Sequence, residues 1–163
     1  MAVLTDHHWP VAEFDAVRRL RVIAATTPGT SMHETLVAAP MESVWAVAAD
    51  LENELPRWLF PDLRSITVTP ASHSDRLVAV ALGHSGLRAR FDVVLRPGWC
   101  LMQSRFLLGG MAATSENGGT RFAFIGGFRG PLRLLTPATR QISARNGDRA
   151  VARFLERINQ RAH

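Results

Sequence analysis

Alternating apolar and polar residues recur along the middle of the chain and predict a series of short strands. In residues 87–96, for example, Arg88, Arg90 and Asp92 fall on one side while Phe91 and Val93 fall on the other, as in a half-buried antiparallel strand. By the same pattern we expect strands at 31–37, 63–69, 75–83, 87–96, 99–108, 110–116 and 120–128. Turn sequences rich in glycine and proline separate these segments, so we expect an antiparallel meander.

Apolar residues at helical spacing occur before and after the first expected strand. Residues 10–25 have the spacing of an amphipathic helix, and Pro28-Gly29 would end it. Two short helices are expected at 41–49 and near 52–59. We therefore divide the chain into an N-terminal helical extension, residues 1–30, and one domain, residues 31–163.

The C-terminal segment predicts a long helix, although Asn146-Gly147-Asp148 has the local chemistry of a helix stop. Arginines recur every four residues straight through the glycine, and apolar residues such as Phe154 and Ile158 lie on the opposing side. This spacing favours one continuous helix. Within it, Gly147 costs about 1 kcal/mol relative to alanine.

Length and composition favour one soluble domain. The chain has 163 residues, 47% of them hydrophobic, which is ordinary for a single globular core. No apolar run approaches the ~20 residues of a membrane-spanning helix, and the first thirty residues lack the apolar core of a secretory signal. A single cysteine, Cys100, fits a reducing compartment. We therefore expect a cytoplasmic protein.

The positive charge is concentrated near the C-terminus. All nineteen basic residues are arginine, for a net charge of +5, and residues 131–163 hold seven of them. No aromatic interleaving or nucleic-acid motif accompanies this run. We interpret it as a solvated helix face and expect neither a nucleic-acid partner nor an integral membrane segment.

The segment after the first strand resembles a known family. It runs through Ala39-Pro40-Met41-Glu42-Ser43-Val44-Trp45 to Asp50-Leu51 and Pro56-Arg57-Trp58. This series is similar to the start of the SRPBCC superfamily, which includes START-like and polyketide cyclase/dehydrase-like domains. The resemblance covers roughly residues 31–160. It implies an α+β helix-grip fold, in which a curved seven-stranded antiparallel sheet wraps around a long C-terminal helix, with two short helices after strand 1.

The same resemblance implies a cavity between the sheet and the C-terminal helix, and hence the binding of a hydrophobic small molecule that is lipid-like, aromatic or polyketide-like. The small residues Ala144 and Gly147 would leave room for the ligand. A close-packed core without a void is the alternative. The expected ligand-binding residues are Trp58, Phe60, Phe91, Met102, Phe106, Phe122, Phe124, Leu135 and Phe154.

No catalytic motif accompanies this pattern. The weak catalytic candidates are Arg105 and Ser104, which a cyclase, aromatase or dehydratase-type enzyme could use to orient a carbonyl ligand. Other polar strand residues are Gln103, His33 and His84. Strand alternation turns Arg105 outward and places Cys100, Met102, Ser104 and Phe106 inward. The histidines lack metal-ligand spacing, Cys100 has the setting of a buried hydrophobe, and we expect neither a metal nor a cofactor.

The outer face of the sheet is also apolar. Residues 75–83 are apolar on both sides, and Ala123 and Ile125 add to this surface. Large exposed apolar patches are uncommon on monomers, so we expect the N-terminal helix to cover this face. A second copy of the chain, forming a homodimer, is a further candidate. A filled barrel that uses this face as a protein-interaction module is the third interpretation of the function.

Overall fold

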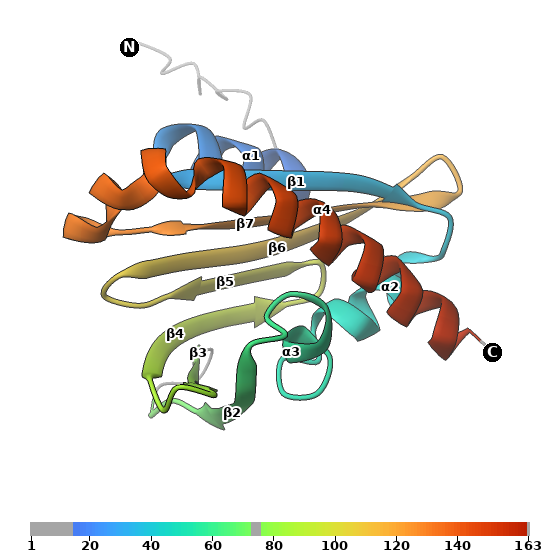
Figure 1. Ribbon diagram of the computed structural model, residues 1–163. Helices are drawn as coiled ribbons and strands as arrows, with labels where there is room; N and C mark the ends of the chain where they lie inside the picture. Colours follow the sequence, from blue (N-terminus) through green and yellow to red (C-terminus); the bar gives the residue numbers. More distant parts are fainter. Residues whose placement is uncertain (1–14, 73–75, 163) are drawn as a thin grey trace, which may run out of the picture.

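A computed structural model describes residues 15–72 and 76–162, with the side chains of residues 139 and 140 outside the description. Its core is one antiparallel seven-stranded sheet in the order β1-β7-β6-β5-β4-β3-β2 (Figure 1). The strands are β1 (Thr30–Val37), β2 (Leu63–Pro70), β3 (Arg76–Gly83), β4 (Arg88–Arg96), β5 (Trp99–Gln103), β6 (Leu107–Glu116) and β7 (Gly119–Phe128). The expected seven-stranded sheet is confirmed, and all but the first strand follow one another as a meander.

One expected strand is shorter than its sequence pattern indicated. The segment 99–108 ends as a strand at Gln103, and β6 already begins at Leu107. The turn between them is held by Ser104, whose hydroxyl oxygen accepts a hydrogen bond from the Leu107 N–H at 2.9 Å. The inward position expected for Phe106 is therefore wrong, because strand alternation stops before it, and its side chain is 38% exposed.

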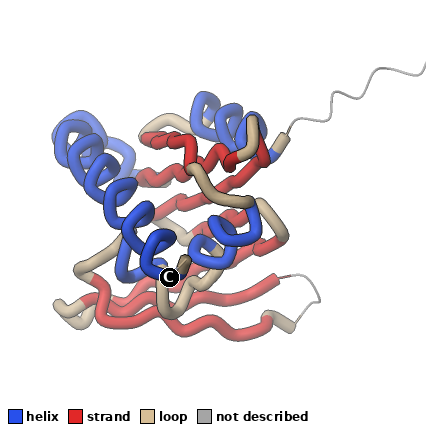
Figure 2. The backbone as a smooth tube through the Cα atoms, turned by 90° about the vertical axis from the view of Figure 1, so that its right-hand side faces the viewer, coloured by secondary structure: helices blue, strands red, loops and turns tan. Residues whose placement is uncertain are grey.

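The helices are α1 (Ala16–Thr26), α2 (Met41–Ala48), α3 (Leu55–Trp58), the short 3-10 helix η1 (Gly130–Leu135) and α4 (Thr136–Arg161). Residues 10–14 of the expected first helix lie outside the described residues. Asp15 caps α1 by accepting a hydrogen bond from the Arg18 N–H at 2.9 Å. The expected continuity of the C-terminal helix through Gly147 is confirmed. Figures 1 and 2 show α1 and α4 on opposite sides of the strands β1 and β7.

The main core lies between the concave face of the sheet and the second half of α4. Trp58, Phe122 and Phe154 are fully buried there. The rings of Phe122 and Phe154 stack with centroids 4.2 Å apart, and Trp58 lies 4.7 Å from Phe154. Aromatic pairs at such separations add about 0.5–1.5 kcal/mol each beyond their buried area. This cluster fixes α4 and α3 on the sheet.

Arginines on the second half of α4 hold it to the segment around α3. Glu54 is 2% exposed and accepts two hydrogen bonds from Arg157, at 2.7 and 2.9 Å. Arg161 lies 3.1 Å from the same carboxylate, and Arg153 donates to the Trp58 carbonyl at 2.9 Å. The expected solvated arginine face is thus wrong for this half of the helix, where the arginines anchor it.

Helix α1 covers the convex face of the sheet over β6 and β7, as expected from Ala123 and Ile125 there. Its Val17 and Leu20 are buried against Leu108, Ala123 and Ile125. Beside this contact, Glu34 accepts hydrogen bonds from both Arg21 of α1 and Arg121 of β7, each at 2.8 Å. Helix α1 therefore packs over β6 and β7 of its own chain.

Candidate ligand-binding site

Two glycine pairs lie side by side in the sheet, Gly109-Gly110 in β6 and Gly126-Gly127 in β7. Gly109 faces Gly126 and Gly110 faces Ile125 across the two strands. Because side chains alternate between the faces of a sheet, Gly110 and Gly127 belong to the convex face. Gly109 and Gly126 belong to the concave face, with Met111, Phe122 and Phe124.

The two convex glycines are required by packing. A Cβ atom at Gly110 would lie 2.9 Å from Cδ1 of Leu20, so the missing side chain lets α1 approach the sheet. A Cβ atom at Gly127 would lie 2.5 Å from the Gly29 carbonyl oxygen, just before β1. These contacts explain one glycine of each pair.

The two concave glycines leave open space. A Cβ atom at Gly126 would meet no atom within 4 Å, and at Gly109 the nearest would be Met102 Cβ at 3.9 Å. No packing contact therefore accounts for the missing side chains, and glycine inside a strand is unfavourable without a reason. We call this bare stretch of backbone, Gly109 and Gly126, the glycine floor. Ser31 borders it on β1 and Met102 on β5.

The glycine floor was not predicted from the sequence, although the glycine pairs that form it are visible there. Two glycine pairs inside adjacent predicted strands mark a place where something approaches the backbone closely. The pairs could not be aligned, however, without the register of β6 on β7, in which Gly109 faces Gly126.

The expected ligand-binding residues separate into three groups. Trp58, Phe122, Phe124 and Phe154 form the buried aromatic cluster and contact one another. Met102 borders the glycine floor, and Phe91 is half-buried on the concave side of β4. The remaining three are exposed: Phe60 by 45%, Phe106 by 38% and Leu135 by 50%.

The expected space at Ala144 and Gly147 is absent. Ala144 is exposed, and a Cβ atom at Gly147 would overlap the imidazole ring of His33. That ring stacks on Phe124 with centroids 5.2 Å apart and an interplanar angle of 21°. Gly147 thus makes room for a side chain of the protein itself.

The polar candidates do not form a catalytic constellation. Arg105 is exposed, with its guanidinium carbon 5.1 Å from the centroid of the Phe106 ring. The Ser104 hydroxyl is used by its turn, the Gln103 amide oxygen accepts from Arg129, and His84 is exposed. Burial raises the pKa of the Cys100 thiol to about 12, so it stays protonated near neutrality.

Among the described residues, no three histidine, cysteine or acidic side chains gather in a way that could hold a metal ion. His7, His8, His73 and His163 lie outside that part of the chain. In the described helices, none is long and apolar enough to cross a membrane.

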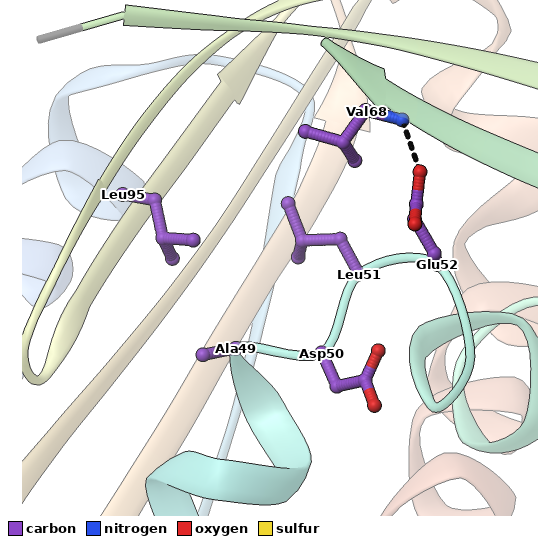
Figure 3. A pocket seen from close by; sticks show the side chains of 6 residues that line it. All are labelled: Ala49, Asp50, Leu51, Glu52, Val68 and Leu95. Carbon is purple, nitrogen blue, oxygen red and sulfur yellow. Dashed lines mark hydrogen bonds between the residues drawn. The ribbon is translucent and has the colours of Figure 1, made fainter. Parts of the chain in front are cut away.

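Two hollows lie beside the connection between α2 and α3. The smaller, about 210 Å³, is lined by Ala49, Asp50, Leu51, Glu52, Val68 and Leu95 (Figure 3). The larger, about 490 Å³, is lined by Glu52, Asn53, Pro56, Arg57, Pro61, Leu63, Arg64 and Ser65. Glu52 lines both, and its carboxylate accepts a hydrogen bond from the Val68 N–H at 2.6 Å. Neither hollow includes a residue of the glycine floor.

No protein-family model and no curated protein matches the chain, whereas solved structures do. TTHA0849 from Thermus thermophilus has a TM-score of 0.60 and 19% identity, with 82% of this chain and 99% of that chain covered. A START superfamily protein from Mycobacterium smegmatis has a TM-score of 0.57 and 14% identity, covering 81% and 98%. The Zhui aromatase/cyclase from Streptomyces sp. R1128 has a TM-score of 0.60 and 15% identity, covering 82% and 95%.

These likenesses agree with the sheet order and the long C-terminal helix. The chain has an SRPBCC-type helix-grip fold, as the sequence resemblance implied.

Proposed function

We propose that the protein binds a hydrophobic small molecule on the glycine floor, between the concave face of the sheet and the first half of α4. The observation that carries this proposal is the open space over Gly126, where even a Cβ atom would meet nothing within 4 Å. Gly126 is itself exposed, so this strip of the concave face is open to a ligand, and an apolar occupant would remove it from water. The fold shared with START and aromatase/cyclase proteins supports the same class of function.

The chemistry around the glycine floor favours a flat, apolar ligand. Bare backbone offers a level surface, and Met102 and Phe124 supply apolar contact beside it. Each 100 Å² of apolar ligand surface removed from water would contribute about 2.5 kcal/mol before the costs of binding. Specificity would then come from shape more than from charge.

The arrangement supports binding more than a cyclase-type reaction. On β1 and β7, His33 is the one titratable residue on the concave side, and its ring lies between Phe124 and Gly147. General acid–base catalysis requires a positioned pair of groups within reach of the ligand. Arg105 is exposed and the Ser104 hydroxyl is used by its turn, so neither supplies a second catalytic group beside His33.

The proposal is tested by placing a large side chain over the glycine floor. Gly126→Phe would place a ring where the ligand is expected, with little effect on the rest of the sheet. We expect binding of a flat apolar fluorophore such as Nile red to weaken at least tenfold, about 1.4 kcal/mol. Thr67→Phe, which adds the same ring at an exposed position on the outer side of β2, is the matched control.

Native mass spectrometry of the purified protein complements the measurement of dye binding. A copurified apolar compound that is lost in Gly126→Phe and kept in Thr67→Phe would support the site. Equal dye binding by all three proteins, or a wild type that takes up no apolar compound, would reject it.

A further inference from the structure

Several connections gather at one edge of the sheet. All neighbouring strands are antiparallel, so every second connection lies at the same end of the strands, and these strand ends form that edge. It holds the α3–β2 connection, the β3–β4 turn, the β5–β6 turn and the start of η1. Two backbone hydrogen bonds link them. The Arg129 N–H donates to the Phe106 carbonyl at 2.7 Å, and the His84 N–H donates to the Asp62 carbonyl at 3.3 Å. Figure 1 shows η1 and the β5–β6 turn together at the left.

Most of the exposed large apolar side chains are found at this edge. Among the described residues eight are exposed, and six belong to these connections or to the adjoining start of α4. We call these six the apolar rim: Phe60, Leu87, Phe106, Leu134, Leu135 and Ile142. Leu87 and Leu134 are 77% and 78% exposed, so they project into solvent without covering anything. Such a concentration on one side indicates an interaction surface.

Arginines accompany the rim. Arg88, Arg105 and Arg133 are exposed on the same connections, and no ion pair ties any of them to another described residue. In the connections themselves Asp62 is the one acidic residue. Arg105 also stacks on Phe106 of the rim. This edge therefore combines exposed apolar side chains with an excess of positive charge.

The larger hollow adds a second, independent feature beside Phe60. Its wall carries Arg57 and Arg64, both exposed and without an ion pair among the described residues. Its one carboxylate, Glu52, is already used by the Val68 N–H. At about 490 Å³ the hollow has the size of a small-molecule site, and its exposed guanidinium groups suit a phosphate.

We propose that this edge docks on a lipid bilayer that carries anionic phospholipids. The rim side chains would enter the interfacial layer, and the arginines, including those of the larger hollow, would meet the lipid phosphates. Separate projecting tips on several turns suit a fluid layer, which closes around each of them. A folded protein partner would need matching cavities for every tip. This proposal is independent of the ligand proposed for the glycine floor.

The test is sedimentation of the full chain with vesicles of phosphatidylcholine alone and with vesicles that also contain phosphatidylglycerol. We expect binding only to the second kind, weakening as salt is added. Leu87→Ser combined with Leu134→Ser should lower the partition coefficient about tenfold or more. Arg57→Ser combined with Arg64→Ser should lower it about tenfold at low salt.

The matched control is Val22→Ser combined with Leu36→Ser, because within residues 15–72 and 76–162 these are the two exposed large apolar residues away from the rim. This variant should bind vesicles like the wild type. Absence of wild-type binding to phosphatidylglycerol vesicles, or an equal loss in the control, would overturn the proposal. Tight binding of soluble polyglutamate, insensitive to the leucine changes, would instead indicate an acidic protein partner and would also overturn it.

Discussion

The imidazole of His33 lies against the backbone of Gly147, held between that residue of α4 and the ring of Phe124. This contact explains why a glycine occurs inside a helix that runs without a break from Thr136 to Arg161. The helix bears the intrinsic cost of glycine, about 1 kcal/mol, because any side chain at this position would displace the histidine.

Gly147→Ala should therefore destabilise the protein, although alanine is the better helix former. The clash with His33 should outweigh the gain in propensity, for a net loss of about 1–3 kcal/mol in the free energy of unfolding. Urea denaturation measures this. In the background of His33→Ala the same change should be neutral or stabilising, and destabilisation there would contradict the contact.

Glu54→Gln should loosen the second half of α4. Removing the charge of a buried carboxylate that pairs with Arg157 should cost about 2–4 kcal/mol of unfolding free energy. Glu156→Gln is the control, because Glu156 is exposed on the same helix and should change stability by less than about 0.5 kcal/mol.

The contribution of Glu54 to stability should depend on pH. Hydrogen bonding from Arg157 lowers the pKa of Glu54 below its ordinary value. Its contribution to stability is therefore complete above the unfolded pKa of about 4.3 and disappears as the pH falls through the lower folded pKa. As the pH falls below about 4, the difference in unfolding free energy between wild type and Glu54→Gln should shrink progressively. A constant difference down to strong acid would contradict this assignment.

Alanine substitutions should affect stability differently at the two glycines of each pair. Gly126→Ala and Gly109→Ala add a methyl group over open space, so they should be neutral or stabilise by up to about 1 kcal/mol. Gly127→Ala and Gly110→Ala should destabilise by about 1–3 kcal/mol, because they push against β1 and α1. Thermal denaturation of the four variants would show whether the open floor exists; equal losses in all four would argue against it.

The thiol of Cys100 should be unreactive in the folded protein. It is fully buried, and burial raises its pKa to about 12, so almost no thiolate is present under mildly alkaline conditions. A disulfide reagent such as DTNB should react with one thiol per chain in guanidinium chloride and with almost none before unfolding. Rapid reaction of the native protein would show that the interior around β5 opens readily.

Spacing patterns between residues close in the sequence predicted most of the helices and strands. Alternation along β4 placed Phe91 and Val93 on the concave face and Arg88 in solvent, as found. Arginine spacing correctly predicted that α4 continues through Gly147, and the apolar residues Ala123 and Ile125 correctly indicated a cover by the N-terminal helix. These features depend on neighbours a few residues away, which a sequence displays directly.

Contacts between distant segments escaped prediction. Nothing in the sequence indicated that His33 would fill the space beside Gly147, far along the chain. The turn hydrogen bonds of Ser104 shortened β5 and exposed Phe106, so one hydroxyl group overrode a regular alternation. The anchoring arginines of α4 were likewise indistinguishable from solvated ones until their carboxylate partner, Glu54, was placed.

The hydrogen bond from the Val68 N–H to Glu52 has a consequence for association between molecules. Among the described strands, β2 pairs only with β3, so its outer edge offers backbone groups to any other extended chain. Glu52 takes up one donor at the middle of that edge, and Pro70 at its end has no donor to offer. The β2 edge of the open sheet is thereby a poorer template for an added strand from another copy, and strand addition at a sheet edge is a first step toward fibrous aggregates.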